Sequence, residues 1–157
     1  MPNQSVFIEQ ATIADLEDVA ALFNEYRVFY QQNSDLDGAR AFLFNRFEHQ
    51  ESVIFLAKEN DEKGKSVGFA QLYPVFSSLS MERSLILNDL FVNESFRGQG
   101  AGKALLQAVS DYCNYIHAKG IELCTGVTNI TAQQLYEKFG YVRDEEFYHY
   151  YKKADNK

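Results

Sequence analysis

Hydrophobic residues recur along this chain with two different spacings, one typical of helices and the other of strands. Helical spacing, with apolar residues three or four apart, covers four segments: 16–30, 39–47, 101–118 and 131–139. Strand-like patterns cover seven segments: 5–9, 52–58, 67–73, 85–92, 121–127, 141–144 and 147–152. The expected order is therefore β-α-α-β-β-β-α-β-α-β-β, which is typical of an α/β protein.

Local signals predict where several of these elements begin and end. Thr12 with Asp15 three residues later forms a capping box for the first helix. The polar segment 59–65 predicts a hairpin between its two flanking strands, and Pro74 ends or kinks the second of them. The strand–helix–strand unit over residues 85–127 requires at least one parallel strand pair.

The composition narrows the class of protein. A chain of 157 residues with only two prolines and no linker is expected to form one domain over residues 1–157. The net charge of −7 disfavours nucleic-acid binding, and it either suits a cationic substrate or serves solubility alone. No secretory signal and no membrane-spanning run is visible, and Cys113 and Cys124 form no disulfide framework, so a cytoplasmic protein is expected.

Three closely spaced glycines lie between the apolar segment 85–92 and the following helix, in the sequence Arg97-Gly98-Gln99-Gly100-Ala101-Gly102-Lys103. Glycines let the backbone approach a ligand, and the N–H groups at a helix start attract anions, so a phosphate-bearing ligand is expected. The spacing fits neither the phosphate loop of nucleotide hydrolases nor the dinucleotide fingerprint. The alternative is a tight turn that binds nothing.

The motif that fits is R/Q-x-x-G-x-G/A of the GNAT family of N-acetyltransferases, met here as Arg97, Gly100 and Gly102. Residues 129–141, NITAQQLYEKFGY, resemble the second motif of that family, in the right order and at the right separation. The match is clear over residues 85–151. Within the family, Phe76-Ser77-Ser78 and the tyrosine-rich tail look most like the branch of the diamine/thialysine and HPA-type acetyltransferases.

The resemblance implies a single-domain fold with a mixed, mostly antiparallel sheet, a splayed parallel pair at its centre and about four flanking helices. It also implies acetyl-CoA as co-substrate and no metal. The residues expected to bind acetyl-CoA are Leu90, Phe91, Val92, Arg97, Gly98, Gln99, Gly100, Ala101, Gly102, Lys103 and Asn129. Attack by the amine on the thioester would be direct. A route through Cys113 or Cys124 is disfavoured, because no histidine lies in a recognisable partner motif.

Two catalytic roles follow from the resemblance, an acid for the departing thiolate and a base for the ammonium. Tyr136 is the expected acid by its position in the second motif. Relatives in the diamine branch tend to carry glutamate where this chain has Asn88, and asparagine cannot accept a proton. Strand alternation predicts Asn88 and Asp89 on opposite faces. The base is then either a water held by Asn88 or Asp89 itself, reached through a bend in the strand.

The acceptor and the partners are less defined. Tyr26, Tyr30, Asp35 and Asp37 fall where the family builds its substrate wall, and they suit a cationic amine or simply form a solvated surface. A small-molecule amine, a protein lysine and a protein N-terminus all fit. The aromatic segment 147–151 predicts a homodimer. The rival hypotheses are a catalytically silent CoA-binding sensor and an interaction module on the same fold.

Overall fold

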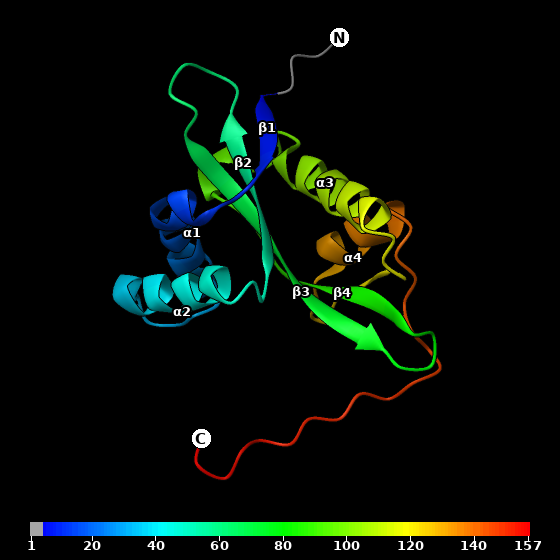
Figure 1. Cartoon of the computed structure of the whole chain (residues 1–157). Coiled ribbons are helices and arrows are strands. Elements are labelled where there is room, and N and C mark those ends of the chain that lie inside the picture. The colour runs from blue at the N-terminus through cyan, green and yellow to red at the C-terminus, as the bar shows by residue number, and fades with distance from the viewer. Residues whose placement is uncertain (1–4) are drawn as a thin grey trace. The chain divides into compact units, whose positions relative to one another are not determined.

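The computed structural model describes residues 5–157 (Figure 1). It divides into two compact units, the first ending at Cys124 and the second running from Thr125 to Lys157. The expectation of one domain over residues 1–157 stays a prediction.

The first unit is built on one sheet in which the strands follow chain order, β1 to β5. The strands are β1 (Val6–Gln10), β2 (Val53–Glu59), β3 (Ser66–Ser77), β4 (Glu82–Val92) and β5 (Ile121–Glu122). The first four pair antiparallel, and β4 pairs with β5 in parallel, with Leu85 opposite Ile121. The predicted mixed, mostly antiparallel sheet with a parallel pair is therefore confirmed.

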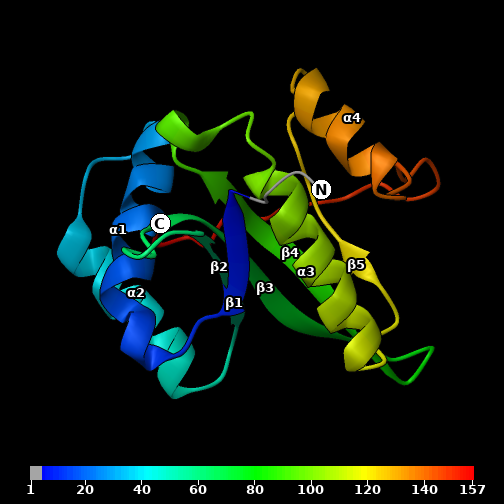
Figure 2. The same ribbon diagram turned by 90° about the horizontal axis from the view of Figure 1, so that it is seen from above.

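Helices cover both faces of this sheet. Helices α1 (Leu16–Phe29) and α2 (Leu36–Glu48) lie on one face and α3 (Ala101–Tyr115) on the other (Figure 2). On the α1 face, the rings of Phe69 and Phe91 pack against Tyr26 at 5.8 and 6.0 Å. On the opposite face, Phe55 of β2 meets Tyr112 of α3 at 5.7 Å. The core thus consists of two layers of apolar side chains that enclose a nearly buried sheet.

The predicted local signals largely hold. The Thr12 side chain accepts a hydrogen bond from the N–H of Ala14, and Asp15 accepts one from the N–H of Thr12, so the capping box is confirmed. It opens a short 3-10 turn, Ile13–Asp15, that leads into α1. Strand β3 neither ends nor breaks at Pro74 but runs on to Ser77. Beyond the pair of Val53 with Leu72, β3 has β4 as its strand partner on one side only, an edge position where a strand tolerates proline.

The second unit contains helix α4 (Ile130–Lys138). Asn129 caps its start by accepting a hydrogen bond from the N–H of Ala132 at 3.3 Å. Gly140, at φ 88°, follows its end. No helix among residues 5–157 is long and apolar enough to cross a membrane.

The strands predicted late in the chain are wrong. Strand β5 ends at Glu122 rather than residue 127, and residues 141–144 and 147–152 form no strand in the described chain. Asp144 instead accepts hydrogen bonds from the N–H groups of Glu146 and Phe147, which curls the chain into a turn. Apolar alternation alone does not make a strand, because a strand also needs a neighbouring edge to satisfy its backbone.

Candidate active site

The glycine loop joins β4 to α3 and presents open backbone. Gly98 and Gly100 have φ of 77° and 88°, in the left-handed region that side chains disfavour. A Cβ atom added at Gly98, Gly100 or Gly102 would meet nothing within 4 Å. Packing inside the protein therefore does not explain these glycines. The left-handed φ accounts for Gly98 and Gly100, and the open backbone of the loop leaves room for a ligand.

The start of α3 adds hydrogen-bond donors to this loop. The N–H of Ala104 donates to the carbonyl oxygen of Gly100 at 3.0 Å. Within the described part of the chain, this is the first hydrogen bond in the helical ladder of α3. The N–H groups of Ala101, Gly102 and Lys103 precede that ladder and lie at the positive end of the helix dipole. With the Lys103 ammonium close by in sequence, these groups fit the pyrophosphate of CoA.

Arg97 fixes the beginning of the loop. Its Nε donates to the carbonyl oxygen of Val92 at 2.9 Å. Its guanidinium also lies 4.7 Å from the ring centre of Phe29 and 5.5 Å from that of Phe91. These contacts link the loop to the end of β4 and to the end of α1.

A β-bulge interrupts β4 at Asn88. The register passes from Asp89 opposite Gln71 to Leu87 opposite Leu72, so Asn88 is the extra residue. The Asn88 Nδ2 donates to Asp89 Oδ1 at 3.0 Å. The prediction that strict alternation separates these two side chains is therefore wrong, because the bulge turns Asn88 toward Asp89. Asn88 is exposed, whereas Asp89 is only 3% exposed.

Asp89 accepts hydrogen bonds from three side chains. Gln71 Nε2 donates to its Oδ2 at 2.6 Å, and the hydroxyl of Tyr26 and the amide of Asn88 also donate to the carboxylate. Burial raises the pKa of Asp89, and these three hydrogen bonds partly oppose that rise. Burial and the Asp89 charge raise the pKa of Tyr73 to about 12, and burial raises that of Tyr26 as well. Both tyrosines are therefore protonated and neutral at physiological pH.

Four residues expected from the sequence meet here. Tyr26 and Tyr30 come from α1, with their ring centres 5.0 Å apart, and Asn88 and Asp89 come from β4. Sequence analysis missed Gln71 and Tyr73 of β3. The available signal was a single glutamine inside the apolar run of residues 67–73, but its partner depends on the strand register, which the sequence does not reveal.

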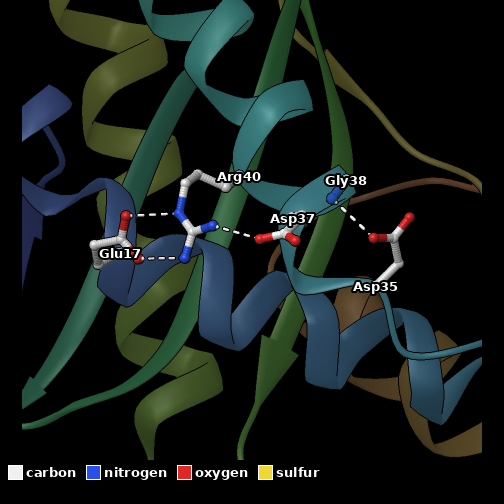
Figure 3. Close-up of polar contacts among 5 residues, drawn as sticks. All are labelled: Glu17, Asp35, Asp37, Gly38 and Arg40. Carbon is white, nitrogen blue, oxygen red and sulfur yellow. Dashed lines mark hydrogen bonds and ion pairs between the residues drawn. The ribbon is translucent and has the colours of Figure 1, made fainter.

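The two carboxylates expected beside these tyrosines have partners in the structure (Figure 3). Asp35 caps α2 by accepting a hydrogen bond from the N–H of Gly38 at 2.9 Å. Asp37 pairs with Arg40 at 2.8 Å, and Arg40 also binds Glu17 at 2.7 Å. These contacts give both carboxylates a role in holding α2 and its junction with α1.

Two expected site residues lie in the second unit. Tyr136 belongs to α4, and its ring centre lies 5.8 Å from that of Tyr141. The Asn129 side chain caps the same helix. Their contacts with a thiolate and with CoA stay predictions. Among residues 5–157, no three His, Cys, Asp or Glu side chains gather in a group that could hold a metal ion.

A bulged strand, a glycine loop and a helix start that follow one another along the chain fit a class of protein that binds a phosphate-bearing ligand. Comparison with known proteins identifies the family within that class. A model of the acetyltransferase (GNAT) family matches residues 17–141, and the chain belongs to this family.

Similar proteins agree with this assignment. The chain is 52% identical over 143 residues to the uncharacterized N-acetyltransferase YhfO of Bacillus subtilis (strain 168), covering 91% of this chain and 94% of that protein. It is 28% identical over 149 residues to the D-amino-acid N-acetyltransferase HPA3 of Saccharomyces cerevisiae, covering 94% and 92%. The crystal structure of a probable acetyltransferase matches with a TM-score of 0.90 at 41% identity, covering 96% of this chain and 99% of that chain. The fold class and the general activity of acyl transfer are thereby supported.

Proposed function

We propose that the protein transfers an acetyl group from acetyl-CoA to a primary amine by direct attack in a ternary complex. The glycine loop is the observation that carries this proposal. It combines two left-handed glycines, open space above three glycines and the N–H groups of the first turn of α3, which precede its ladder of hydrogen bonds. Gly98 to Lys103 would hold the pyrophosphate, and the backbone of residues 90–92 would bind the pantetheine arm.

The first candidate for the acceptor is a small-molecule amine. The name of the yeast relative, a D-amino-acid N-acetyltransferase, supports a small acceptor, and so do the aromatic rings of Tyr26 and Tyr30 beside the bulge. A protein lysine or N-terminus remains the second candidate.

In the proposed reaction, the amine nitrogen attacks the carbonyl carbon of the thioester. The C–N bond forms, the C–S bond breaks, and the ammonium proton leaves through a base while the thiolate takes a proton from an acid. A backbone N–H near Leu90 would stabilise the negative charge on the carbonyl oxygen. The family motif supports Tyr136 as the acid.

Asp89 is the base in this proposal. Its pKa is raised by burial, which makes the carboxylate a better proton acceptor near neutral pH. Asn88 connects it to the exposed side of the strand. An ionised carboxylate only accepts hydrogen bonds, so the Asn88 amide nitrogen must face Asp89. The Asn88 oxygen is then left to accept a hydrogen bond from the ammonium or from a water that passes the proton to Asp89.

The test is an assay of thiol release from acetyl-CoA across a panel of amines, paired with a direct measurement of acetyl-CoA binding. The panel holds polyamines, D- and L-amino acids, aminoglycosides and a lysine peptide. Turnover of at least one amine is expected, with the acetylated product confirmed by mass spectrometry. Binding of acetyl-CoA without turnover of any amine would favour the silent sensor, and failure to bind any CoA species would favour the interaction module.

We also propose a homodimer in the cytoplasm. The support for the dimer is the aromatic C-terminal segment, in which the side chains of Phe147, Tyr148, Tyr150 and Tyr151 are exposed. Exposed aromatic clusters mark interaction surfaces. Light scattering at micromolar concentration is expected to give twice the 18.0 kDa chain mass, and a single species of one chain mass would contradict the dimer.

A further inference from the structure

We infer that Gln71 is a positioning residue for acetyl transfer, which holds the Asp89 carboxylate so that its Oδ1 faces the exposed Asn88. The inference rests on the proposed function, in which Asp89 is the base. It adds a residue on β3 that neither the family motifs nor the sequence pattern contains.

The geometry of the pair supports this role. Gln71 and Asp89 lie directly opposite each other on β3 and β4. Gln71 is 0% exposed, and its Nε2 lies 2.6 Å from Asp89 Oδ2. A hydrogen bond to a charged acceptor in a buried site is shorter and stronger than one between neutral groups. Gln71 therefore fixes the buried oxygen of the carboxylate, and Oδ1 is left toward Asn88.

The side-chain amide oxygen of Gln71, Oε1, supports the same conclusion. Because the Gln71 amide nitrogen faces the carboxylate, its Oε1 must point elsewhere. That Oε1 is buried and finds no hydrogen-bond partner among the described residues. An unpartnered buried acceptor is destabilising, so an apolar residue would serve packing better at this position. The bond to Asp89 accounts for a glutamine here, whereas packing does not.

Two tyrosines also interact with Asp89, and they differ from Gln71 in being titratable. From α1, the Tyr26 hydroxyl donates to Asp89, and Tyr30 lies beside Tyr26. On β3, burial and the charge of Asp89 raise the pKa of Tyr73, and the charge of Arg46 on α2 lowers it. Gln71 differs from both tyrosines because it is uncharged at every accessible pH and fully buried. Its loss therefore removes one donor without adding or removing a titratable group.

The experiment is a carbon-13 NMR titration of the Asp89 side-chain carboxyl, assigned by its disappearance in Asp89→Asn. It compares the wild type, Gln71→Met and the control Ile54→Val. Methionine keeps the size of the side chain but removes the donor. Ile54 is buried and lies opposite Gln71 on β2, on the side away from Asp89, so Ile54→Val disturbs the same region without touching the hydrogen bond.

The Asp89 transition is expected to move to higher pH in Gln71→Met and to stay in place in Ile54→Val. With a turned-over amine, kcat below the transition is expected to fall about tenfold or more in Gln71→Met, because a hydrogen bond to a charged group shifts its ionisation by about that factor. A transition that does not move, or that moves equally in Ile54→Val, overturns the inference. If Gln71→Met does not fold, Gln71→Leu gives the same test, since leucine also removes the donor and adds no titratable group.

The titration needs no substrate, so the two proposals fail separately. A shifted Asp89 transition together with an enzyme that acetylates no amine would retain Gln71 as the residue that holds Asp89 and would reject the proposed function. Normal turnover with an unmoved transition would retain the proposed function and would reject the role of Gln71.

Discussion

The protein carries carboxylates in two contrasting settings, beneath the bulge of β4 and at the junction of α1 with α2. Asp89 is 3% exposed, lies among neutral donors and has a raised pKa. Asp35 and Asp37 are exposed, and each already has a structural partner, the N–H of Gly38 and the guanidinium of Arg40. Burial without a counter-charge makes a carboxylate a proton acceptor, whereas exposure beside a cation or a helix start makes it a structural anchor. The position of a carboxylate along the sequence is therefore a weaker guide to its chemistry than the environment of its side chain.

The largest effect is expected for Asp89→Asn, which tests whether the buried carboxylate differs in function from the exposed ones. Loss of a general base typically lowers the rate about a hundredfold to ten-thousandfold, and that range is expected for kcat. The fold should persist, because the Gln71 amide can rotate and its unpartnered Oε1 can accept a hydrogen bond from the amide that the substitution introduces. Steady-state kinetics with a circular-dichroism spectrum checks both points. Asp37→Asn is the matched control, and equal losses in the two variants would remove the distinction.

Tyr136→Phe tests the residue that we propose as the acid of the reaction. The reference pKa of tyrosine, about 10, lies above that of a thiol, about 8.5, so the hydroxyl can donate to a thiolate at neutral pH. A fall in kcat of about a hundredfold or more is expected, with acetyl-CoA affinity little changed. A stable variant with full kcat, in an assay limited by chemistry, would mean that another group protonates the thiolate. A variant that unfolds would make Tyr136 a packing residue.

Gly100→Val separates cofactor binding from the chemistry at Asp89. A β-branched residue at φ 88° strains the backbone by about 1–3 kcal/mol and covers the approach to the N–H groups of α3. Affinity for acetyl-CoA, measured by calorimetry, is expected to fall about tenfold or more. The apolar face of α3 is untouched, so the helix should remain. Wild-type affinity in this variant would mean that the cofactor lies elsewhere.

The raised pKa of Asp89 also predicts a pH-dependent stability. A carboxyl whose folded pKa lies above its unfolded value is held best when protonated, so its contribution to stability falls as the pH rises from about 4 through the folded pKa. The Tm of Asp89→Asn minus that of the wild type is therefore expected to increase from pH 4 to pH 8 by a few degrees. The same difference for Asp37→Asn is the control. A difference for Asp89→Asn that falls with pH would show that the folded pKa is lowered instead.

The smallest effects are expected at the α1–α2 junction. Asparagine caps helices about as well as aspartate, so Asp35→Asn should change the free energy of unfolding by only a few tenths of a kcal/mol. Asp37→Asn removes an exposed ion pair worth about 0–1 kcal/mol. Turnover should stay within about twofold for neutral and dicationic amines alike. A loss of turnover confined to dicationic amines in both variants would mean that these carboxylates bind the cationic acceptor.

Features that depend on local sequence could be predicted, and features that depend on strand register could not. The glycine loop, the capping box at Thr12 and the order of elements through α4 follow from short-range patterns, and the structure contains them. The bulge at Asn88 and the pairing of Gln71 with Asp89 depend on how β3 and β4 align. The apolar alternation after residue 140 predicted strands, although no pattern within the segment can supply a partner edge. The capping role of Asp35 could have been recognised, since it directly precedes α2.

In the proposed mechanism, the ionised Asp89 carboxylate accepts the proton of the amine. The most direct test compares the pH at which kcat/KM falls on its acidic side with the pH at which the Asp89 carboxyl titrates in the free enzyme. The comparison uses the amine that is turned over best, at a pH range in which its own ionisation has been measured and corrected. The two transitions are expected to coincide, above the ordinary range of an aspartate, and both are expected to be absent from Asp89→Asn. An acidic limb that persists unchanged in Asp89→Asn would contradict this mechanism.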